Sequence, residues 1–184
     1  MVHKALYDII FIKGKVAKDI EGNNPSIVSS ILVFVAAFIY GLTMFFVRGE
    51  SLLGELNFFY LLFFILFGYM YMVASQLGIT LMLWAMCRIL KGLPRFFALF
   101  SVIGYTFLPY GVLVSIVTYL NNTTELSMMP QVLLVTTAIS FLALFIYSLV
   151  RVVKIMQDFS LKKASICVAL FLVFFGSFIY VFGY

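Results

Sequence analysis

Residues 57–87 read NFFYLLFFILFGYMYMVASQLGITLMLWAMC, a run of 31 residues that contains no charged side chain. A helix needs about 20 mostly apolar residues to cross the hydrocarbon core of a bilayer, which is about 30 Å thick. At about 1.5 Å per residue, this run forms a helix about 46 Å long. We therefore expect a membrane span that tilts strongly, protrudes into water or breaks. The place best suited to a bend or a tight contact is residues 74–78, Ala-Ser-Gln-Leu-Gly.

The composition of the whole chain points the same way. Of its 184 residues, 65% are hydrophobic and only 10% are charged. Soluble domains are about 45–50% apolar and about 25% charged. A water-soluble domain of this size cannot bury so much apolar surface, and a disordered chain does not carry it. The expected fold is therefore an all-α, polytopic membrane protein, built as a single domain over residues 1–184.

Four more uncharged apolar runs are long enough to cross the bilayer. Together with the first run they predict five transmembrane helices at about residues 27–47, 57–87, 96–120, 131–150 and 164–184. Pro25, Pro94 and Pro130 lie just before or at the start of a predicted span, where a missing N–H costs little. Only Pro109 lies inside a span.

The basic residues predict how this bundle is oriented. If the N-terminus is cytoplasmic, eleven of the 12 Lys and Arg lie in cytoplasmic segments, and only Arg48 lies outside. The opposite orientation reverses this ratio and conflicts with the positive-inside rule. We therefore expect an integral, multi-pass protein with a cytoplasmic N-terminus and Tyr184 outside, in the cell membrane if the source is prokaryotic. No cleavable signal peptide is expected, because the first 24 residues mix lysines with acidic residues.

Residues 1–25 precede the first span and have an amphipathic pattern. From Val2 to Ile20, apolar residues recur at near-helical spacing between lysines and acidic residues. This pattern predicts a helix that lies on the inner membrane surface, which Gly14 can divide into two pieces. The alternative is a water-soluble helix that packs beneath the bundle.

The predicted spans contain no Asp, Glu, Lys, Arg or His, and the one histidine of the chain is His3. Acid–base catalysis, a catalytic triad and a typical metal site all need such groups held close together. We therefore expect no catalytic residues, no metal, no cofactor and no enzyme activity. The same absence disfavours an ion-coupled transporter. The net charge of +5 lies beside the spans and is not interleaved with exposed aromatic residues, so no nucleic-acid partner is expected.

The chain has two cysteines, Cys87 and Cys167, both near the predicted cytoplasmic ends of spans. Because the cytoplasm is reducing, we expect no disulfide bond between them. Both are expected to fill space as small apolar residues. For Cys87, which lies next to Arg88, S-acylation is the alternative.

Two features inside the predicted spans interrupt an otherwise apolar bundle. Gln76 is the one large polar side chain deep in a span, and its amide needs a partner in hydrocarbon. An interhelical hydrogen bond is the expected role, and contact with a ligand or ion is the alternative. In the third span, Pro109 leaves the Tyr105 carbonyl short of its helical donor, and Thr106 can use part of that capacity. The segment from Gly104 to Pro109 is therefore a candidate kink, either held by packing or facing a pocket.

Small residues recur four positions apart in several spans, which lets helix backbones approach closely. We expect these pairs to pack inside the monomer, with dimerisation as the alternative. The pairs are Ala37 and Gly41, Ala74 and Gly78, Gly111 and Ser115, Thr136 and Ser140, and Ser165 and Ala169.

The basic residues of the later predicted cytoplasmic loops are the candidate binding surface. They are Arg88, Lys91, Arg95, Arg151, Lys154, Lys162 and Lys163. Near an anionic membrane surface each such residue contributes about 1 kcal/mol. We expect the surface to bind anionic lipid headgroups of the inner leaflet or an acidic protein partner. The alternative is that these residues only set the topology.

The arrangement resembles the Yip1 family in three places. The first is residues 9–20 followed by Asn-Pro-Ser at residues 24–26. The second is residues 88–97, RILKGLPRFF, followed by Gly-Tyr at residues 104–105 and Leu-Pro at residues 108–109. The third is Arg-Val-Val at residues 151–153 with SLKKA at residues 160–164, where the last span begins.

This resemblance implies a protein with five spans. In eukaryotic members it goes with the early secretory pathway and with a cytosolic N-terminus that engages small Rab-type GTPases. The present sequence lacks the long cytosolic domain and the acidic-aromatic motifs of those members, and it resembles the compact bacterial and archaeal members.

We therefore expect a non-enzymatic membrane scaffold or interaction protein that organises the bilayer or takes part in trafficking-like processes. A protein partner or a second copy of the chain is a further expectation. The first alternative is a passive transport or lipid-moving protein, with a path past Gln76 and the Pro109 kink. The second alternative is a small accessory subunit of a larger membrane complex.

Overall fold

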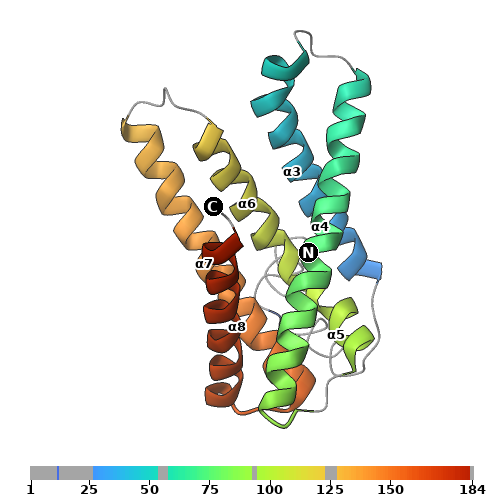
Figure 1. The fold of residues 1–184 in the computed structure, drawn as a ribbon, viewed down its shortest axis with the longest axis vertical. Helices are drawn as coiled ribbons and strands as arrows, with labels where there is room; N and C mark the ends of the chain where they lie inside the picture. Colours follow the sequence, from blue (N-terminus) through green and yellow to red (C-terminus); the bar gives the residue numbers. More distant parts are fainter. Residues whose placement is uncertain (1–11, 13–26, 54–57, 93–94, 123–127, 183–184) are drawn as a thin grey trace, which may run out of the picture.

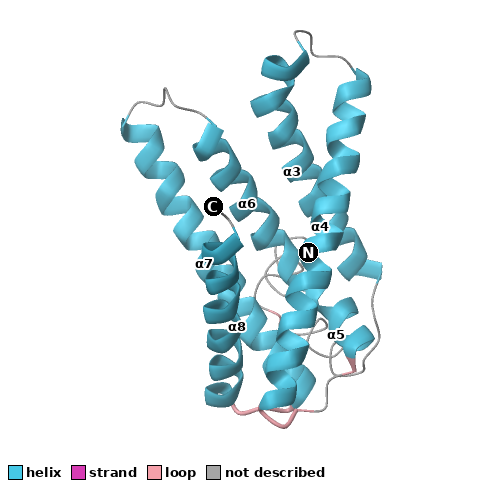
Figure 2. Cartoon of the chain, viewed as in Figure 1, coloured by secondary structure: helices cyan, strands magenta, loops and turns pink. Residues whose placement is uncertain are grey.

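The computed structural model describes residue 12 and residues 27–53, 58–92, 95–122 and 128–182. Within these residues the chain forms helices and short connections and contains no strand (Figure 1, Figure 2). The all-α fold predicted from the sequence is confirmed. The helices are α3 (Ile27–Leu53), α4 (Phe58–Ile89), α5 (Phe96–Ile103), the 3-10 helix η1 (Gly104–Thr106), α6 (Phe107–Asn122), α7 (Met128–Gln157) and α8 (Leu161–Phe182).

Four stretches of the described residues are long and apolar enough to cross a membrane. They are Ile27–Arg48, Phe58–Ile89, Phe96–Asn122 and Met128–Gln157. They match the first four predicted spans, and α3, α4 and α7 continue beyond the predicted ends. The fifth predicted span overlaps α8, which has 22 residues and is not one of these four. The predicted amphipathic helix at residues 1–25 lies outside the described residues, apart from Ile12.

The second predicted span forms one uninterrupted helix, α4, of 32 residues. At about 1.5 Å per residue it is about 48 Å long, so its excess length is met without a break. Of residues 74–78, where a bend or a tight contact was expected, Gly78 makes no close approach to another helix, because a Cβ added there would meet no atom within 4 Å. The close approach occurs ten residues earlier, at Gly68, where an added Cβ would lie 2.7 Å from the Ala37 carbonyl oxygen.

Helix α3 packs mainly against α4 and α6. Toward α4, a Cβ added at Gly41 would lie 2.8 Å from the Ile65 Cα, and Gly41 in turn faces Gly68. Contacts this short are possible only because both helices carry a glycine where they cross. The pair Ala37 and Gly41 therefore packs inside the monomer, as predicted.

The contact of α3 with the third span also depends on small residues. A Cβ added at Gly111 of α6 would lie 2.6 Å from the Ala36 Cβ. At the start of the same span, Gly104 lies against Ser29, whose carbonyl oxygen would be 2.9 Å from an added Cβ. Ser115, four residues after Gly111, is buried. The Gly111 and Ser115 pair therefore also packs as predicted.

Helices α7 and α8 lie at the side of this core, and α6 and α7 diverge from α3 and α4 toward the upper end in Figure 1. Three of the predicted small-residue pairs are exposed, so the expectation that they pack inside the monomer is wrong. These pairs are Ala74 and Gly78 on α4, Thr136 and Ser140 on α7, and Ser165 and Ala169 on α8.

Candidate functional site

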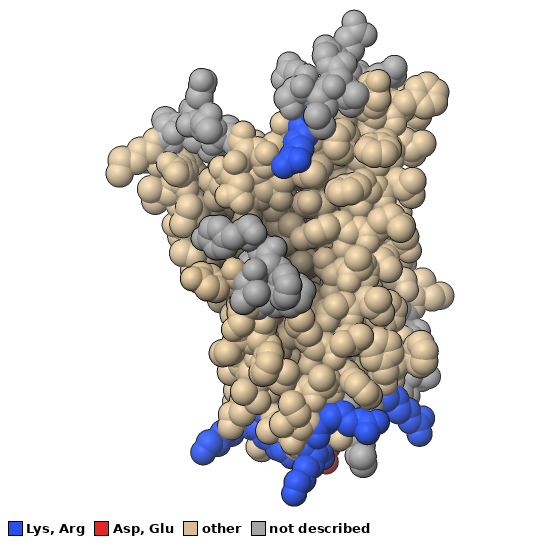
Figure 3. Space-filling model, in the orientation of Figure 1, with Lys and Arg blue, Asp and Glu red and all other residues tan. Residues whose placement is uncertain are grey.

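The seven basic residues of the candidate surface lie at the ends of four helices. Arg88 is in the last turn of α4, Arg95 is the N-cap of α5, and Lys154 is in the last turn of α7. Figure 3 shows that the basic side chains gather at one end of the molecule, with a separate one toward the opposite end. We call the gathered set the basic end: Arg88, Lys91, Arg95, Arg151, Lys154, Lys162 and Lys163.

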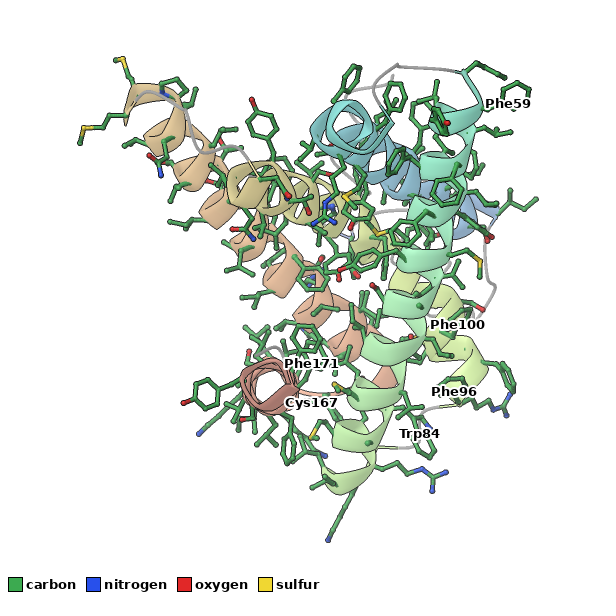
Figure 4. All side chains as sticks on the ribbon, turned by 45° about the horizontal axis from the view of Figure 1, so that its top comes forward. Phe59, Trp84, Phe96, Phe100, Cys167 and Phe171 are labelled. Atoms are coloured by element: carbon green, nitrogen blue, oxygen red, sulfur yellow. The ribbon has the colours of Figure 1, made fainter. Side chains whose placement is uncertain are left out.

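Aromatic rings hold two of these cations in place. The Arg88 guanidinium carbon lies 5.0 Å from the centre of the Trp84 ring, and the Lys163 Nζ lies 4.0 Å from the centre of the Phe159 ring. Trp84 also contacts Phe96 edge to face at 6.3 Å, and both are labelled in Figure 4. A cation over an aromatic ring near the end of an apolar helix is typical of a membrane–water interface.

Helix α4 ends in a Schellman motif that turns the chain sharply at the basic end. Gly92 N donates to the Cys87 carbonyl oxygen at 2.8 Å, and Lys91 N donates to the Arg88 carbonyl oxygen at 3.0 Å. Lys91 is left-handed, with φ 59°. Lysine occupies a position that usually favours glycine, so this turn places a cation at the tip of the loop.

Helix α7 ends in a similar way, and the two ends touch. Asp158 is left-handed, with φ 49°, and Phe159 N donates to the Lys154 carbonyl oxygen at 3.1 Å. A Cβ added at Gly92 would lie 2.6 Å from the Gln157 Oε1 and 2.9 Å from the Phe159 Cζ. The loop after α4 is therefore packed against the loop after α7, which fixes the relative positions of their cations.

Arg151 differs from the other basic residues because its side chain turns toward the protein. Its Nη2 donates to the Ile12 carbonyl oxygen at 3.4 Å, and its Nε is buried without a hydrogen-bond partner. Ile12 itself is fully buried in the core. Arg151 therefore holds residue 12 against the bundle, and the structure sets it apart from the exposed cations Arg88, Lys91 and Arg95.

Gln76 makes the interhelical hydrogen bond expected of it. Its Nε2 donates to the Phe100 carbonyl oxygen of α5 at 2.7 Å, and Thr80 Oγ1 donates to the Gln76 carbonyl oxygen at 2.6 Å. The side chain is 6% exposed. Its amide thereby joins α4 to the first part of the third span.

The third span is irregular where the sequence predicts a kink, but its geometry differs from a single kinked helix. The 3-10 helix η1 separates α5 from α6, so Pro109 falls in the first turn of α6, where its missing N–H costs little. Thr106 Oγ1 donates to the Ile103 carbonyl oxygen at 2.8 Å and not to that of Tyr105. Gly104, Tyr105 and Pro109 are all buried, so packing surrounds this segment.

A cluster of hydroxyl groups in the interior was not predicted from the sequence. Tyr40 of α3 stacks on Tyr71 of α4, with ring centres 4.8 Å apart, and its hydroxyl lies near that of Thr118. The hydroxyl of Tyr110 of α6 lies near those of Ser75 and Tyr71. These hydroxyl groups therefore lie close together between three helices. The i, i+4 spacing of Tyr71 and Ser75 was the available signal.

A pocket of about 320 Å³ opens between α3, α4 and α5, and we call it the α3–α5 pocket. Its lining combines apolar residues with hydroxyl and amide side chains. Its lining includes Ser29, Ser30, Tyr69, Val73, Gln76 and Ser101.

The two cysteines lie side by side in the interior. Cys87 Sγ and Cys167 Sγ are 3.4 Å apart, both thiols are free, and both residues are 0% exposed. This burial fits space-filling residues and not an accessible site for S-acylation. Among the described residues no group of three or more His, Cys, Asp or Glu could hold a metal ion.

The comparisons with known proteins identify one family. The family model described as Yip1 domain matches residues 7–183, nearly the whole chain. A search of curated proteins and a search of solved structures gave no match.

Proposed function

Because the chain belongs to the Yip1 domain family, and because its apolar helices fit a membrane protein, we propose that it is a non-enzymatic membrane scaffold. Its basic end binds the anionic lipid headgroups of the inner leaflet and thereby organises the bilayer around it. A protein partner or a second copy of the chain completes the assembly in this proposal.

The proposal includes five spans, with α8 as the last. This helix has 22 residues, which corresponds to about 33 Å, and no charged residue follows Lys163 within it. The N-terminal segment, residues 1–25, lies on the inner membrane surface, the N-terminus is cytoplasmic and the C-terminus is outside. The gathering of cations at one end of the described bundle supports this orientation (Figure 3).

The observation that carries the proposal is that cations from four helices meet at one level of the bundle. Two docked loops hold them there, and Arg88 and Lys163 are braced on aromatic rings. Such an arrangement presents several charges at one end of the molecule to an anionic surface. Each exposed cation contributes about 1 kcal/mol near that surface.

The test is a charge reversal at the exposed tip of the basic end. Full-length protein in phosphatidylcholine nanodiscs doped with phosphatidylglycerol is released for native mass spectrometry, and retained phosphatidylglycerol is counted. We expect Lys91→Glu with Arg95→Glu to lower this retention by roughly fivefold or more for each cation removed. The control, Asn121→Glu with Asn122→Glu, adds negative charge at the end of α6 and leaves retention unchanged. Unchanged retention in the charge-reversed protein, with membrane insertion intact, refutes the proposal.

A lipid-moving or lipid-binding protein is the second candidate, and the α3–α5 pocket favours it. The sequence suggested a path for such a lipid past Gln76 and Pro109. Gln76 lines the pocket, whereas Pro109 is buried in the packed interior. An accessory subunit is favoured only by the exposed small residues of α4, α7 and α8.

A further inference from the structure

We infer that the α3–α5 pocket binds the uncharged, hydroxyl- or ester-bearing headgroup of a membrane lipid of the diacylglycerol type. This inference concerns a different part of the molecule from the basic end, and it rests on the second candidate function, whose lipid class it names. It is argued from the polar groups of the pocket, from the absence of charge among the described residues that line it and from its depth.

The walls of the pocket contain polar groups that are already satisfied. Ser29 Oγ donates to the Ser101 carbonyl oxygen, and Gln76 Nε2 donates to the Phe100 carbonyl oxygen at 2.7 Å. Ser101 Oγ donates to the Phe97 carbonyl oxygen at 2.9 Å. These bonds join α3, α4 and α5 around the pocket and give it a defined shape.

Two other hydroxyl groups of the lining, those of Ser30 and Tyr69, belong to exposed side chains. The Tyr69 hydroxyl has no hydrogen-bond partner among the described residues. The residue four positions before Ser30 is Ser26, which lies outside the described residues. Most other span hydroxyls, such as that of Thr43, donate to the carbonyl oxygen four residues earlier. A hydroxyl without a partner is costly in hydrocarbon. A ligand hydroxyl or ester in the pocket removes this cost.

Among the described residues that line the pocket there is no Lys, Arg, Asp or Glu, so these residues offer no group that pairs with a phosphate. Apolar residues such as Ile27, Val33 and Val73 complete it and suit the glycerol backbone and the first carbons of acyl chains. A volume of about 320 Å³ is at the small end of ligand pockets and fits a headgroup, while the acyl chains remain in the bilayer.

The depth of the pocket favours an uncharged ligand as well. Gln76 lies 12 residues from Arg88 along α4, about 18 Å along the helix axis, and Phe100 lies five residues from Arg95 along α5, about 8 Å along its axis, so the pocket lies within the apolar layer beyond the basic end. A phosphate at that depth would lose its hydration without gaining a cation. An uncharged diol ester can sit below the level of the phosphates at a far smaller cost.

The experiment uses full-length protein in phosphatidylcholine nanodiscs with a trace of diacylglycerol that carries a photoactivatable diazirine. We expect crosslinks on α4 and α5 around Val73 and Phe100, and competition by unlabelled diacylglycerol but not by phosphatidylglycerol. The double variant Ser30→Ala, Tyr69→Phe removes both exposed hydroxyl groups of the lining and keeps the aromatic ring at position 69. Since one hydrogen bond changes affinity roughly two- to tenfold, labelling falls about tenfold or more.

Matched controls separate this site from general lipid contact. Ser140→Ala with Tyr119→Phe removes two hydroxyls from other helix faces and leaves labelling unchanged. Lys91→Glu with Arg95→Glu also leaves it unchanged, so the two proposals fail independently. Equal labelling of the Ser30→Ala, Tyr69→Phe protein and the wild type overturns the inference. Equal competition by phosphatidylglycerol overturns it too, because the pocket then does not select an uncharged headgroup.

Discussion

Two regions of the bundle carry the same small-residue pattern and use it differently. In the core of α3, α4 and α6, Gly41 meets Gly68 and Gly111 meets Ala36, so the backbones nearly touch. On α7 and α8 the corresponding pairs are exposed, and large side chains such as Phe171 fill the interior instead. The pattern produces a close contact only where the partner helix also has a small residue at the crossing. The core is therefore expected to resist change, and the outer faces of α7 and α8 to accept it.

The largest expected effect comes from filling the glycine contact of the core. Gly68→Val places its side chain against the Ala37 carbonyl oxygen and the Gly41 backbone, which cannot move aside. We expect a loss of about 1–3 kcal/mol in the free energy of unfolding, measured by steric trapping in bicelles. The matched control in the same helix is Gly78→Val, where an added Cβ meets nothing within 4 Å. Equal losses at the two positions would show that helix propensity, and not packing, accounts for the effect.

A smaller effect is expected where α7 is fixed to the end of α4. Gly92→Ala brings a methyl group against Gln157 Oε1 and Phe159 Cζ, both of which can shift in part. We expect the free energy of unfolding to fall by about 1 kcal/mol and the Gly92 amide to exchange hydrogen faster. Gly176→Ala, in open space on α8, serves as the control. Unchanged exchange at Gly92 would mean that the two loops do not hold each other.

The hydrogen bond between α4 and α5 is expected to matter less than the glycine contacts. Gln76→Leu removes the donor to the Phe100 carbonyl oxygen and costs about 0.6–1 kcal/mol in the free energy of unfolding. Gln131→Leu, at an exposed position near the start of α7, changes it by less. A gain in stability for Gln76→Leu would contradict the role assigned to this bond.

The smallest effect is expected on the exposed face of α7. The double variant Thr136→Val, Ser140→Ala removes two hydroxyl groups that donate hydrogen bonds to carbonyl oxygens of their own helix. We expect the free energy of unfolding to change by less than about 0.5 kcal/mol. Native mass spectrometry from nanodiscs is the second readout. A change of oligomeric state would turn this face from a tolerant surface into an interface.

Much of the fold follows from the sequence because length and apolarity are read directly from the residues. The uncharged runs locate the helices, and Arg88 and Lys154 mark helix ends. The interior is harder to predict. The stacked Tyr40 and Tyr71 look, in sequence, like any aromatic residues that face lipid.

The irregular third span shows a similar limit. Pro109 indicates a disturbed backbone, but it does not reveal that η1 would restart the helix and place the proline in a first turn. The candidate cations could be named from the sequence, whereas the inward turn of Arg151 depends on its contact with Ile12. Such contacts are made between residues far apart in the chain, so no local pattern encodes them.

The central claim is that the basic end faces the cytoplasm, and labelling of single cysteines from outside intact cells tests it most directly. Asp158→Cys lies at the basic end and Asn122→Cys at the end of α6, and both positions are exposed. Cys87 and Cys167 are fully buried and give a low background. The account predicts that a membrane-impermeant maleimide labels Asn122→Cys in intact cells and Asp158→Cys only after permeabilisation. The reverse result would place the basic end outside and contradict the account.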